Sequence, residues 1–212
     1  MKDIPVFATE YGVASLFLKE ISYRQEARIR IQSSCDPKAL LEECLGFCVA
    51  CGAESVFASG HDCLAEFPHY TAIVKMQRPA NDMDTTDACL FPVQEHTAVA
   101  WRTVYNERMK NSPNASYMSM QDVNEMLEAK DAYFVHRCGK LVGIGRIRDG
   151  LISVVAACEK GAGRDVVLAL AGIADSDMLT LQVADRNEKA MKLYKDLGFI
   201  VTEKLHDWYR IK

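Results

Sequence analysis

The chain has 212 residues, of which 49% are hydrophobic and 25% are charged, and its formal net charge is −4. This composition is typical of a globular protein with one large domain or two small ones. The negative charge disfavours a sequence-independent nucleic-acid binder, which needs a basic face. No apolar run approaches the ~20 residues of a membrane helix, and the N-terminus lacks the apolar segment of a signal peptide. We therefore expect a cytoplasmic protein that binds neither nucleic acid nor a membrane.

Eight cysteines are scattered along the chain, without the dense spacing of a disulfide-rich secreted domain. Three of them, Cys44, Cys48 and Cys51, lie on one helical face of LLEECLGFCVACGAE. Small hydrophobic residues in a helix core explain this spacing, and a zinc or redox cluster is the alternative. Because no second CxxC pair or nearby histidine pair accompanies them, we expect no metal.

Apolar or alternating segments predict four strands in the first eighty residues. The second of these strands alternates Arg with Ile, which predicts one wet face. Residues 22–25 are expected to turn between the first two strands, and residues 61–67 to be irregular or weakly helical. The predicted strands are 13–19, 27–32, 55–58 and 71–76.

One helix is predicted between the second and third of these strands. Asp36 is a suitable N-cap, and Pro37 suits the first helical position because its missing N–H has no intrahelical partner there. Gly52 is a suitable residue just beyond a helix C-terminus. The helix is therefore expected to run to about Cys51.

Residues 79–87 (PANDMDTTD) are polar and acidic and begin with proline. Such a composition is typical of a linker. We therefore predict a first half at 1–78, this linker, and a second half at 88–212.

The second half predicts a strand, two helices, a three-strand meander, a helix, a strand, a helix and two final strands. Asp149-Gly150 predicts a two-residue hairpin turn within the meander. The expected helices are 96–109, 120–129, 164–171 and 187–197. The expected strands are 89–93, 133–137, 141–146, 151–157, 178–183, 199–203 and 208–211.

A turn of small residues, Lys160-Gly161-Ala162-Gly163, joins the strand 151–157 to the helix 164–171. Glycines let backbone N–H groups approach an anion closely, and the helix dipole favours negative charge at a helix N-terminus. The turn alone is a weak predictor of an anion site, because glycine turns before helices also serve as plain connectors.

The segment that follows, LQVADRNEKAMKLYKDLGF, resembles the motif around the fifth strand and last helix of the GNAT N-acetyltransferase superfamily. The order of elements over residues 88–212 is also similar to that family. The matching positions are Leu181, Val183, Asn187, Ala190, Leu193, Tyr194, Gly198 and Phe199.

The family's other motif has an Arg or Gln, two residues, a Gly, one residue, then a Gly or Ala. Lys160, Gly163 and Asp165 fall at these positions in the preferred register, so Asp165 departs from the motif. The alternative register places Cys158, Gly161 and Gly163 there and lacks the basic residue. In the preferred register, the Asp165 side chain has to point away from the ligand, or coenzyme binding is weakened.

The resemblance implies an α/β (α+β) fold with a mixed, mostly antiparallel sheet flanked by helices, and acetyl-CoA as the cosubstrate. It implies that the fourth and fifth strands splay apart and that the pantetheine arm lies between them. Backbone groups of the fourth strand would pair with pantetheine amides, and the turn would hold the pyrophosphate. The implied cofactor-binding residues are Val155, Ala157, Lys160, Gly161, Ala162, Gly163, Arg164, Asp165 and Asn187.

Tyr194 matches the family's general acid, which protonates the leaving coenzyme A thiolate. The alternative is a purely structural tyrosine, since it shares an apolar helix face with Leu193. Asn187 is either a cofactor contact or an N-cap, or both. No general base is identified; candidates by residue type alone are His136, Glu107, Glu125 and Asp185.

Residues 12–77 repeat the order strand, strand, helix, strand, connector, strand. They lack a glycine turn before the helix and an Asn and Tyr pair like Asn187 and Tyr194. This pattern suggests a degenerate GNAT-like N-terminal half that does not bind coenzyme A.

We therefore expect an acetyl-CoA-dependent N-acetyltransferase that acts by direct transfer on a primary amine. The acceptor is a small molecule or a peptide, and the sequence does not name it. The alternative is a non-catalytic acyl-CoA-binding sensor or assembly protein with the same fold. A homodimer is one assembly state that the sequence leaves open.

Overall fold

The computed structural model describes residues 5–81, 83–113 and 115–212. The chain forms two compact units. Unit 1 comprises Met1–Ile73 together with Leu205–Lys212, and unit 2 comprises Val74–Lys204. The segment 79–87, expected as a linker, therefore falls inside unit 2, and the C-terminal residues fold with unit 1.

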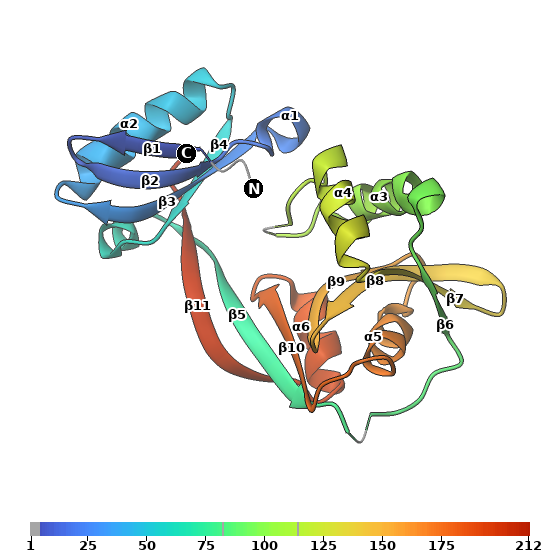
Figure 1. The fold of residues 1–212 in the computed structure, drawn as a ribbon. Helices are drawn as coiled ribbons and strands as arrows, with labels where there is room; N and C mark the ends of the chain where they lie inside the picture. Colours follow the sequence, from blue (N-terminus) through green and yellow to red (C-terminus); the bar gives the residue numbers. More distant parts are fainter. Residues whose placement is uncertain (1–4, 82, 114) are drawn as a thin grey trace. The chain divides into compact units, whose positions relative to one another are not determined.

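Unit 1 is built from a mixed sheet and its connecting helices (Figure 1). Its elements are β1 (Val6–Thr9), β2 (Gly12–Phe17), α1 (Ile21–Arg24), β3 (Glu26–Ser34), α2 (Pro37–Ala50), β4 (Ser55–Ser59), a 3₁₀ helix (Asp62–Glu66) and parts of β5 (His69–Pro79) and β11 (Ile200–Arg210). The strand order is β1-β2-β3-β4-β11. Strands β3 and β4 are parallel, and α2 connects them. Apolar side chains of β2, β3, β4 and α2 form the core of this unit.

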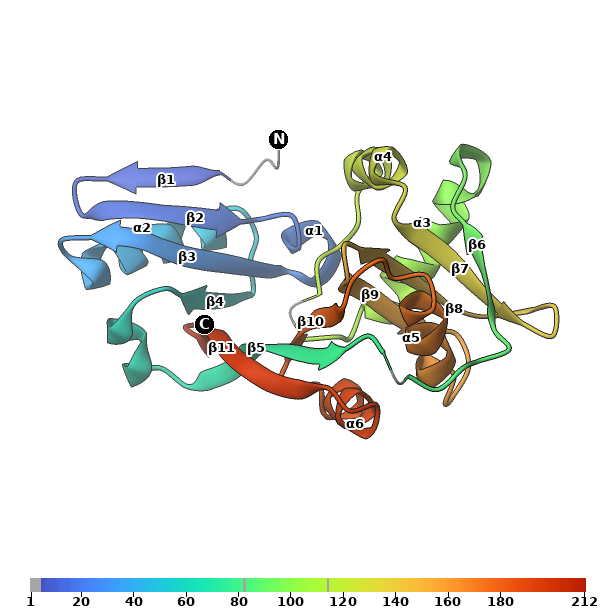
Figure 2. The same ribbon diagram turned by 60° about the horizontal axis from the view of Figure 1, so that its bottom comes forward.

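Unit 2 contains a larger sheet with helices on both faces (Figures 1 and 2). Its elements are β6 (Cys89–Pro92), α3 (Glu95–Met109), α4 (Met120–Ala129), β7 (Ala132–Arg137), β8 (Lys140–Arg148), β9 (Leu151–Ala157), α5 (Gly163–Ala171), β10 (Met178–Ala184), α6 (Glu188–Asp196) and the remaining parts of β5 and β11. The strand order is β11-β5-β10-β9-β8-β7-β6. Helices α3 and α4 pack on one face through the cluster around Trp101. Helices α5 and α6 contribute to the cluster on the other face.

Two long strands belong to both units. β5 passes from unit 1 into unit 2 between Ile73 and Val74, and β11 passes back between Lys204 and Leu205. The sequence predicted two separate final strands where β11 is one continuous strand. That prediction was wrong because the polar residues between them belong to the ladder as well.

Several local predictions are confirmed with their physical causes. The Asp36 side chain accepts a hydrogen bond from the Ala39 backbone N–H at 3.1 Å and caps α2. Gly52, just after this helix, has φ +96°, which glycine adopts without strain. Asp149 (φ +48°) and Gly150 (φ +74°) both take the left-handed conformation of a two-residue hairpin turn.

Other local predictions were wrong. The strand β1 was not predicted from its four residues, and the expected turn at 22–25 is largely the short helix α1. Arg28, expected on the wet face of β3, is buried, lies over the Trp208 ring and pairs with Glu26. Its wet neighbours on that face are Arg30 and Gln32.

The cysteines of α2 divide into two kinds. Cys44 and Cys48 are fully buried in the core of unit 1, as the helix-core interpretation predicted. Cys51 follows the last helical turn and is exposed, so it does not share that buried face. Burial raises the pKa of Cys44 to about 11 and that of Cys48 to about 12, so both thiols stay protonated at neutral pH.

Candidate functional site

Strands β9 and β10 are in register over two residue pairs, at the start of β9 and in the middle of β10. Their parallel register joins Thr180 to Leu151 and Leu181 to Ile152. Along the other edge of β9, the register with β8 shifts at the same place, where Ile147 pairs with Ile152 and Arg146 with Val154. This shift is a β-bulge at Ser153, and bulges bend a strand and redirect its side chains. The splay that the resemblance implied therefore begins where β9 bulges.

The bulge changes which face of the sheet the following residues occupy. Ile152 and, beyond the bulge, Val155 and Ala157 all pack on the α5 side. Val154 and Ala156 pack on the α3 side. Val155 and Ala157 lie beyond the last residue of β9 that is in register with β10. Backbone groups on this edge of β9 are therefore the ones available to a ligand.

The glycine turn ends β9 and starts α5. Gly161 has φ +87°, and a Cβ there would meet nothing within 4 Å. Ala162, the N-cap residue, is buried and has no side chain with which to cap the helix. The first backbone N–H groups of a helix lack intrahelical partners, so α5 offers several donors beside this open turn. Such an arrangement suits an anion.

Helix α5 lies close to the sheet because β8 carries glycines beneath it. A Cβ on Gly143 would lie 2.3 Å from Val166 Cγ2, and a Cβ on Gly145 would lie 2.5 Å from Leu170 Cδ1. Both glycines are therefore required for this packing distance. The pattern Gly-Ile-Gly in the sequence is a signal from which this approach could have been predicted.

The Asp165 side chain bonds to partners that lie outside both the turn and α5. Its Oδ1 accepts a hydrogen bond from Thr86 Oγ1 at 3.0 Å, and its Oδ2 accepts one from Arg137 Nη1 at 2.5 Å. The sequence left open whether this side chain points away from the ligand or weakens coenzyme binding. In the structure, both of its oxygens accept hydrogen bonds from other elements. Neither partner could be found from the sequence, since each lies far from Asp165 along the chain.

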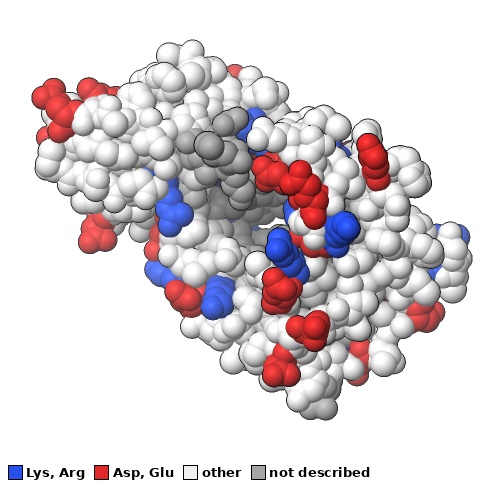
Figure 3. Space-filling model, in the orientation of Figure 1, with Lys and Arg blue, Asp and Glu red and all other residues white. Residues whose placement is uncertain are grey.

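The basic residues of the turn are accessible. Lys160 is exposed, and Arg164 is exposed and forms an ion pair with Asp84 of the expected linker. Basic and acidic side chains are interspersed over the face seen in Figure 3. Close to the α5 N-terminus, the charge of Arg164 is thus partly compensated by the carboxylate of Asp84.

Helix α6 approaches the α5 N-terminus. A Cβ on Gly163 would lie 2.9 Å from Leu193 Cδ2 of α6. Asn187 Oδ1 accepts a hydrogen bond from the Ala190 N–H at 3.3 Å, so Asn187 is the N-cap of this helix. The cap role is thus observed, whereas a cofactor contact by Asn187 stays a prediction.

Tyr194 lies on the buried face of α6. It is 8% exposed and packs edge-to-face on Phe199, with 5.9 Å between ring centroids. Burial raises the pKa of Tyr194 to about 12. It shares one apolar cluster with Val155, Ala157 and Ala162. The structure thus places these four predicted site residues in one apolar cluster of unit 2.

The candidate bases are dispersed. Glu107, Glu125 and Asp185 are exposed on separate elements of unit 2. His136 lies on β7 and packs edge-to-face against Phe91 at 5.0 Å. These positions identify no general base.

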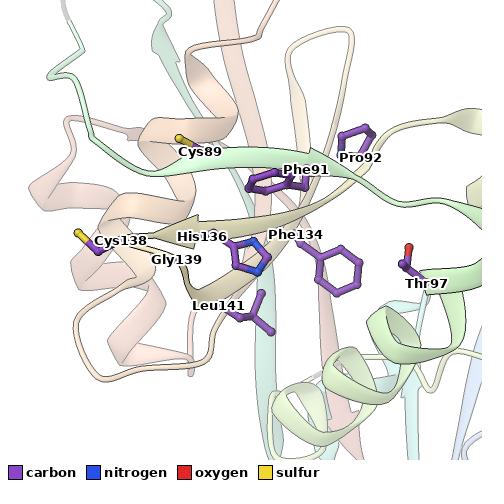
Figure 4. Close-up of a pocket in the computed structure, with 9 residues that line it drawn as sticks. All are labelled: Cys89, Phe91, Pro92, Thr97, Phe134, His136, Cys138, Gly139 and Leu141. Carbon is purple, nitrogen blue, oxygen red and sulfur yellow. The ribbon is translucent and has the colours of Figure 1, made fainter.

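His136 lines a separate apolar pocket of about 590 Å³ between the start of α3 and the strands β6 to β8. Figure 4 shows Phe134, His136 and Leu141 projecting from the sheet, with Thr97 on α3. None of the predicted coenzyme-binding residues lines this pocket. This pocket is therefore distinct from the end of β9. Its lining residues are Cys89, Phe91, Pro92, Thr97, Phe134, His136, Cys138, Gly139 and Leu141.

Two further properties bear on the class of protein. In the part of the chain that the structure describes, no helix is both long and apolar enough to cross a bilayer. Among the described residues, no group of three or more His, Cys, Asp or Glu side chains is placed to hold a metal ion.

Comparisons with known proteins identify the fold. No family model and no curated protein matches the sequence. Among solved structures, the chain is similar to a GCN5-related N-acetyltransferase from Sphaerobacter thermophilus, with 14% identity, a TM-score of 0.58, and coverage of 93% of this chain and 75% of that one. It is also similar to a GCN5-related N-acetyltransferase from Anabaena variabilis, with 11% identity, a TM-score of 0.61, and coverage of 98% of this chain but only 58% of that one.

A functionally unknown conserved protein from Staphylococcus epidermidis has a similar length and fold. It shares 11% identity with this chain, with a TM-score of 0.61 and coverage of 99% of this chain and 94% of that one. At such identities the likeness concerns the fold. The chain has the GNAT fold, a mixed and mostly antiparallel sheet flanked by helices, as the sequence predicted.

Proposed function

We propose that this protein is an N-acetyltransferase that transfers the acetyl group of acetyl-CoA to a primary amine. The observation that carries this proposal is the end of the β9–β10 register at Ile152, one residue before the bulge. This divergence leads to the glycine turn and the N-terminus of α5. The free edge of β9 suits the amide-bearing arm of coenzyme A, and the N-terminus of α5 suits its diphosphate.

The residues present fit such a ligand. Backbone groups of Val155 and Ala157 would pair with the pantetheine amides as a neighbouring strand would. The N–H groups of the first turn of α5 would donate to the pyrophosphate, and Lys160 and Arg164 would add compensating charge. Open space at Gly161 is consistent with close approach of a ligand to the turn.

Acetyl-CoA supplies the acetyl group as a thioester, which an unprotonated amine attacks directly. Positioning of the two reactants accounts for much of the rate in such a reaction. A backbone N–H near Val155 would stabilise the charge that develops on the carbonyl oxygen. The amine loses its proton to a base or to water, and the thiolate leaves.

Tyr194 would act on the leaving group. With a pKa of about 12, its phenol keeps its proton at neutral pH. An ordinary thiol has a pKa of about 8.5, so Tyr194 is a weaker acid than the thiol of coenzyme A. Its role is therefore to donate a hydrogen bond to the thiolate and to share a proton with it as the bond to the acetyl carbon breaks.

Incubation of the purified protein with acetyl-CoA and a panel of small-molecule and peptide amines tests the proposal. Release of free thiol above the rate of hydrolysis is expected with at least one amine. Absence of turnover with every amine, together with intact coenzyme A binding, would instead support a non-catalytic acyl-CoA sensor. The same panel would identify the class of amine that is the acceptor. We further propose that the protein acts in the cytoplasm.

We also propose that unit 1 is a degenerate GNAT-like half that does not bind coenzyme A. Its parallel strands β3 and β4 are joined by a helix, as β9 and β10 are joined by α5. In unit 1, however, the two strands stay in register over five consecutive pairs, from Glu26 with Ser55 to Arg30 with Ser59. Their facing backbone groups bond to each other, which supports the absence of a ligand there.

A further inference from the structure

Asp165 is the acidic residue of the first turn of α5, where the proposed function places the pyrophosphate. Side chains of a helix tilt toward its N-terminus. An unrestrained carboxylate at this position would lean toward the N–H groups that are to bind the diphosphate, and it would repel that anion. A mechanism that keeps it away is therefore required for coenzyme binding.

Both oxygens of this carboxylate are held by donors outside α5. Thr86 Oγ1 donates to Oδ1 at 3.0 Å, and Arg137 Nη1 donates to Oδ2 at 2.5 Å. The Asp165 side chain is 17% exposed and that of Arg137 is 38% exposed, so the ion pair is partly shielded from water. The orientation of the carboxylate is thus fixed, and its charge is compensated by a cation.

The two donors are themselves fixed. The Ala88 N–H donates to Thr86 Oγ1 at 3.2 Å, which leaves the Thr86 hydroxyl hydrogen for Asp165. Arg137 is the last residue of β7 and is in register with Lys140 across the hairpin. Cys138 and Gly139 both have positive φ, so a tight turn holds the end of this strand.

We propose that Thr86 and Arg137 are positioning residues for coenzyme binding. They hold the Asp165 carboxylate away from the α5 N-terminus and so keep its first N–H groups free for a diphosphate. This inference rests on the proposed function. It explains how the chain carries an acidic residue where the family motif has Gly or Ala, neither of which needs restraint.

Titration calorimetry of the full chain with coenzyme A, and with pantetheine, tests the proposal. Pantetheine lacks the diphosphate, so it reports on the arm alone. Arg137→Ala is expected to weaken coenzyme A binding about tenfold, the size of a charge effect at a helix terminus, and to leave pantetheine binding unchanged. Thr86→Val, which replaces the hydroxyl by a methyl group of similar size, is expected to weaken coenzyme A binding by about threefold.

Removal of the carboxylate charge is the decisive rescue. Asp165→Asn in the Arg137→Ala background is expected to restore coenzyme A affinity to within about twofold of the unaltered protein. Arg148→Ala is the matched control, because Arg148 also pairs with an aspartate, Asp149, but on the exposed end of β8. It is expected to change neither affinity.

The proposal is overturned if Arg137→Ala binds coenzyme A as the unaltered protein does, if pantetheine binding falls equally, or if Asp165→Asn restores nothing. Circular dichroism establishes that each variant is folded. If Arg137→Ala does not fold, Thr86→Val with and without Asp165→Asn provides the same comparison. Failure of the unaltered protein to bind coenzyme A is a different result, which overturns the proposed function itself.

Discussion

Each unit of the chain contains one parallel strand pair joined by a helix, and the two pairs differ in how far they stay together. In unit 1, β3 and β4 are in register over five pairs. In unit 2, β9 and β10 are in register over two pairs and then diverge at a bulge. Backbone groups that bond to a neighbouring strand are not available to a ligand. The divergence therefore decides which unit is suited to bind an amide-bearing molecule.

The helices that join the two strand pairs also differ in how many backbone N–H groups at their N-termini are available to an anion. Asp36 caps α2 with its own carboxylate and Pro37 removes one donor, whereas α5 follows a glycine turn and has no side-chain N-cap. A carboxylate cap occupies the donors that an anion would need and adds repulsion. The same topology thus gives a structural connection in one unit and the proposed anion site in the other, and a few residues at one turn make the difference.

The number of coenzyme sites is the largest expected difference between the units. Titration of the full chain with acetyl-CoA is expected to give one site per chain, since only unit 2 has the diverging strands and the uncapped helix. Calorimetric stoichiometry measures this directly. Two sites per chain would show that the continuous β3–β4 register does not prevent binding.

Replacement of Tyr194 by Phe is expected to reduce the rate of acetyl transfer about 100-fold or more, because the hydrogen-bond donor to the leaving thiolate is lost. Coenzyme A affinity is expected to persist, since the ring and its packing on Phe199 remain. Steady-state kinetics against the preferred amine measures the loss. Tyr209→Phe, which removes a phenol hydroxyl from unit 1, is the matched control and is expected to leave the rate unchanged.

The pH dependence of this step follows from burial. Because the pKa of Tyr194 is raised from 10.0 to about 12, the phenol stays protonated until the pH approaches that value. A basic limb of the rate profile near neutral pH therefore has to come from another group. If Tyr194→Phe abolished such a limb, the role given to Tyr194 would be wrong.

Glycine-to-alanine substitutions are expected to change the free energy of unfolding in opposite directions in the two units. In Gly143→Ala, the new Cβ would lie 2.8 Å from the Ala156 backbone oxygen and 2.3 Å from Val166 Cγ2. We expect a loss of ~1–3 kcal/mol in the free energy of unfolding, the usual cost of overpacking. Gly46, in the exposed interior of α2, has nothing within 4 Å of a new Cβ. Gly46→Ala is expected to stabilise unit 1 by ~0.5–1 kcal/mol.

Urea unfolding, with hydrogen exchange to assign each change to a unit, measures both effects. If the two substitutions destabilise the protein equally, the close approach of α5 to β8 is not the reason why Gly143 and Gly46 differ.

The smallest expected effect concerns a cation in the first turn of each helix. Arg164 is the second residue of α5 and Lys38 the second residue of α2, and each forms an exposed ion pair, with Asp84 and Glu66 respectively. Arg164→Ala is expected to weaken coenzyme A binding by about two- to fivefold, since exposed charges at helix ends contribute little. Lys38→Ala is expected to have no effect. Equal affinities for both variants would remove Arg164 from the binding site.

Much of the fold was predictable because its signals are local. The cap at Asp36, the turn at Asp149-Gly150 and the meander of β7, β8 and β9 each follow from a few adjacent residues. The predictions that failed concern segments whose structure depends on residues far away in the sequence. Arg28 is buried because Trp208, from the far end of the chain, lies over it, and β11 is continuous because the ladder extends through residues that looked like a break.

The candidate site shows the same division. From the sequence alone came the glycine turn, the departure at Asp165 and the last-helix motif with Asn187 and Tyr194. Where β9 leaves β10, and which way Asp165 points, were decided only by the tertiary structure. The physical reason is distance along the chain: Thr86 lies 79 residues from Asp165 and Arg137 lies 28 residues from it, so no local pattern records that these donors hold its carboxylate.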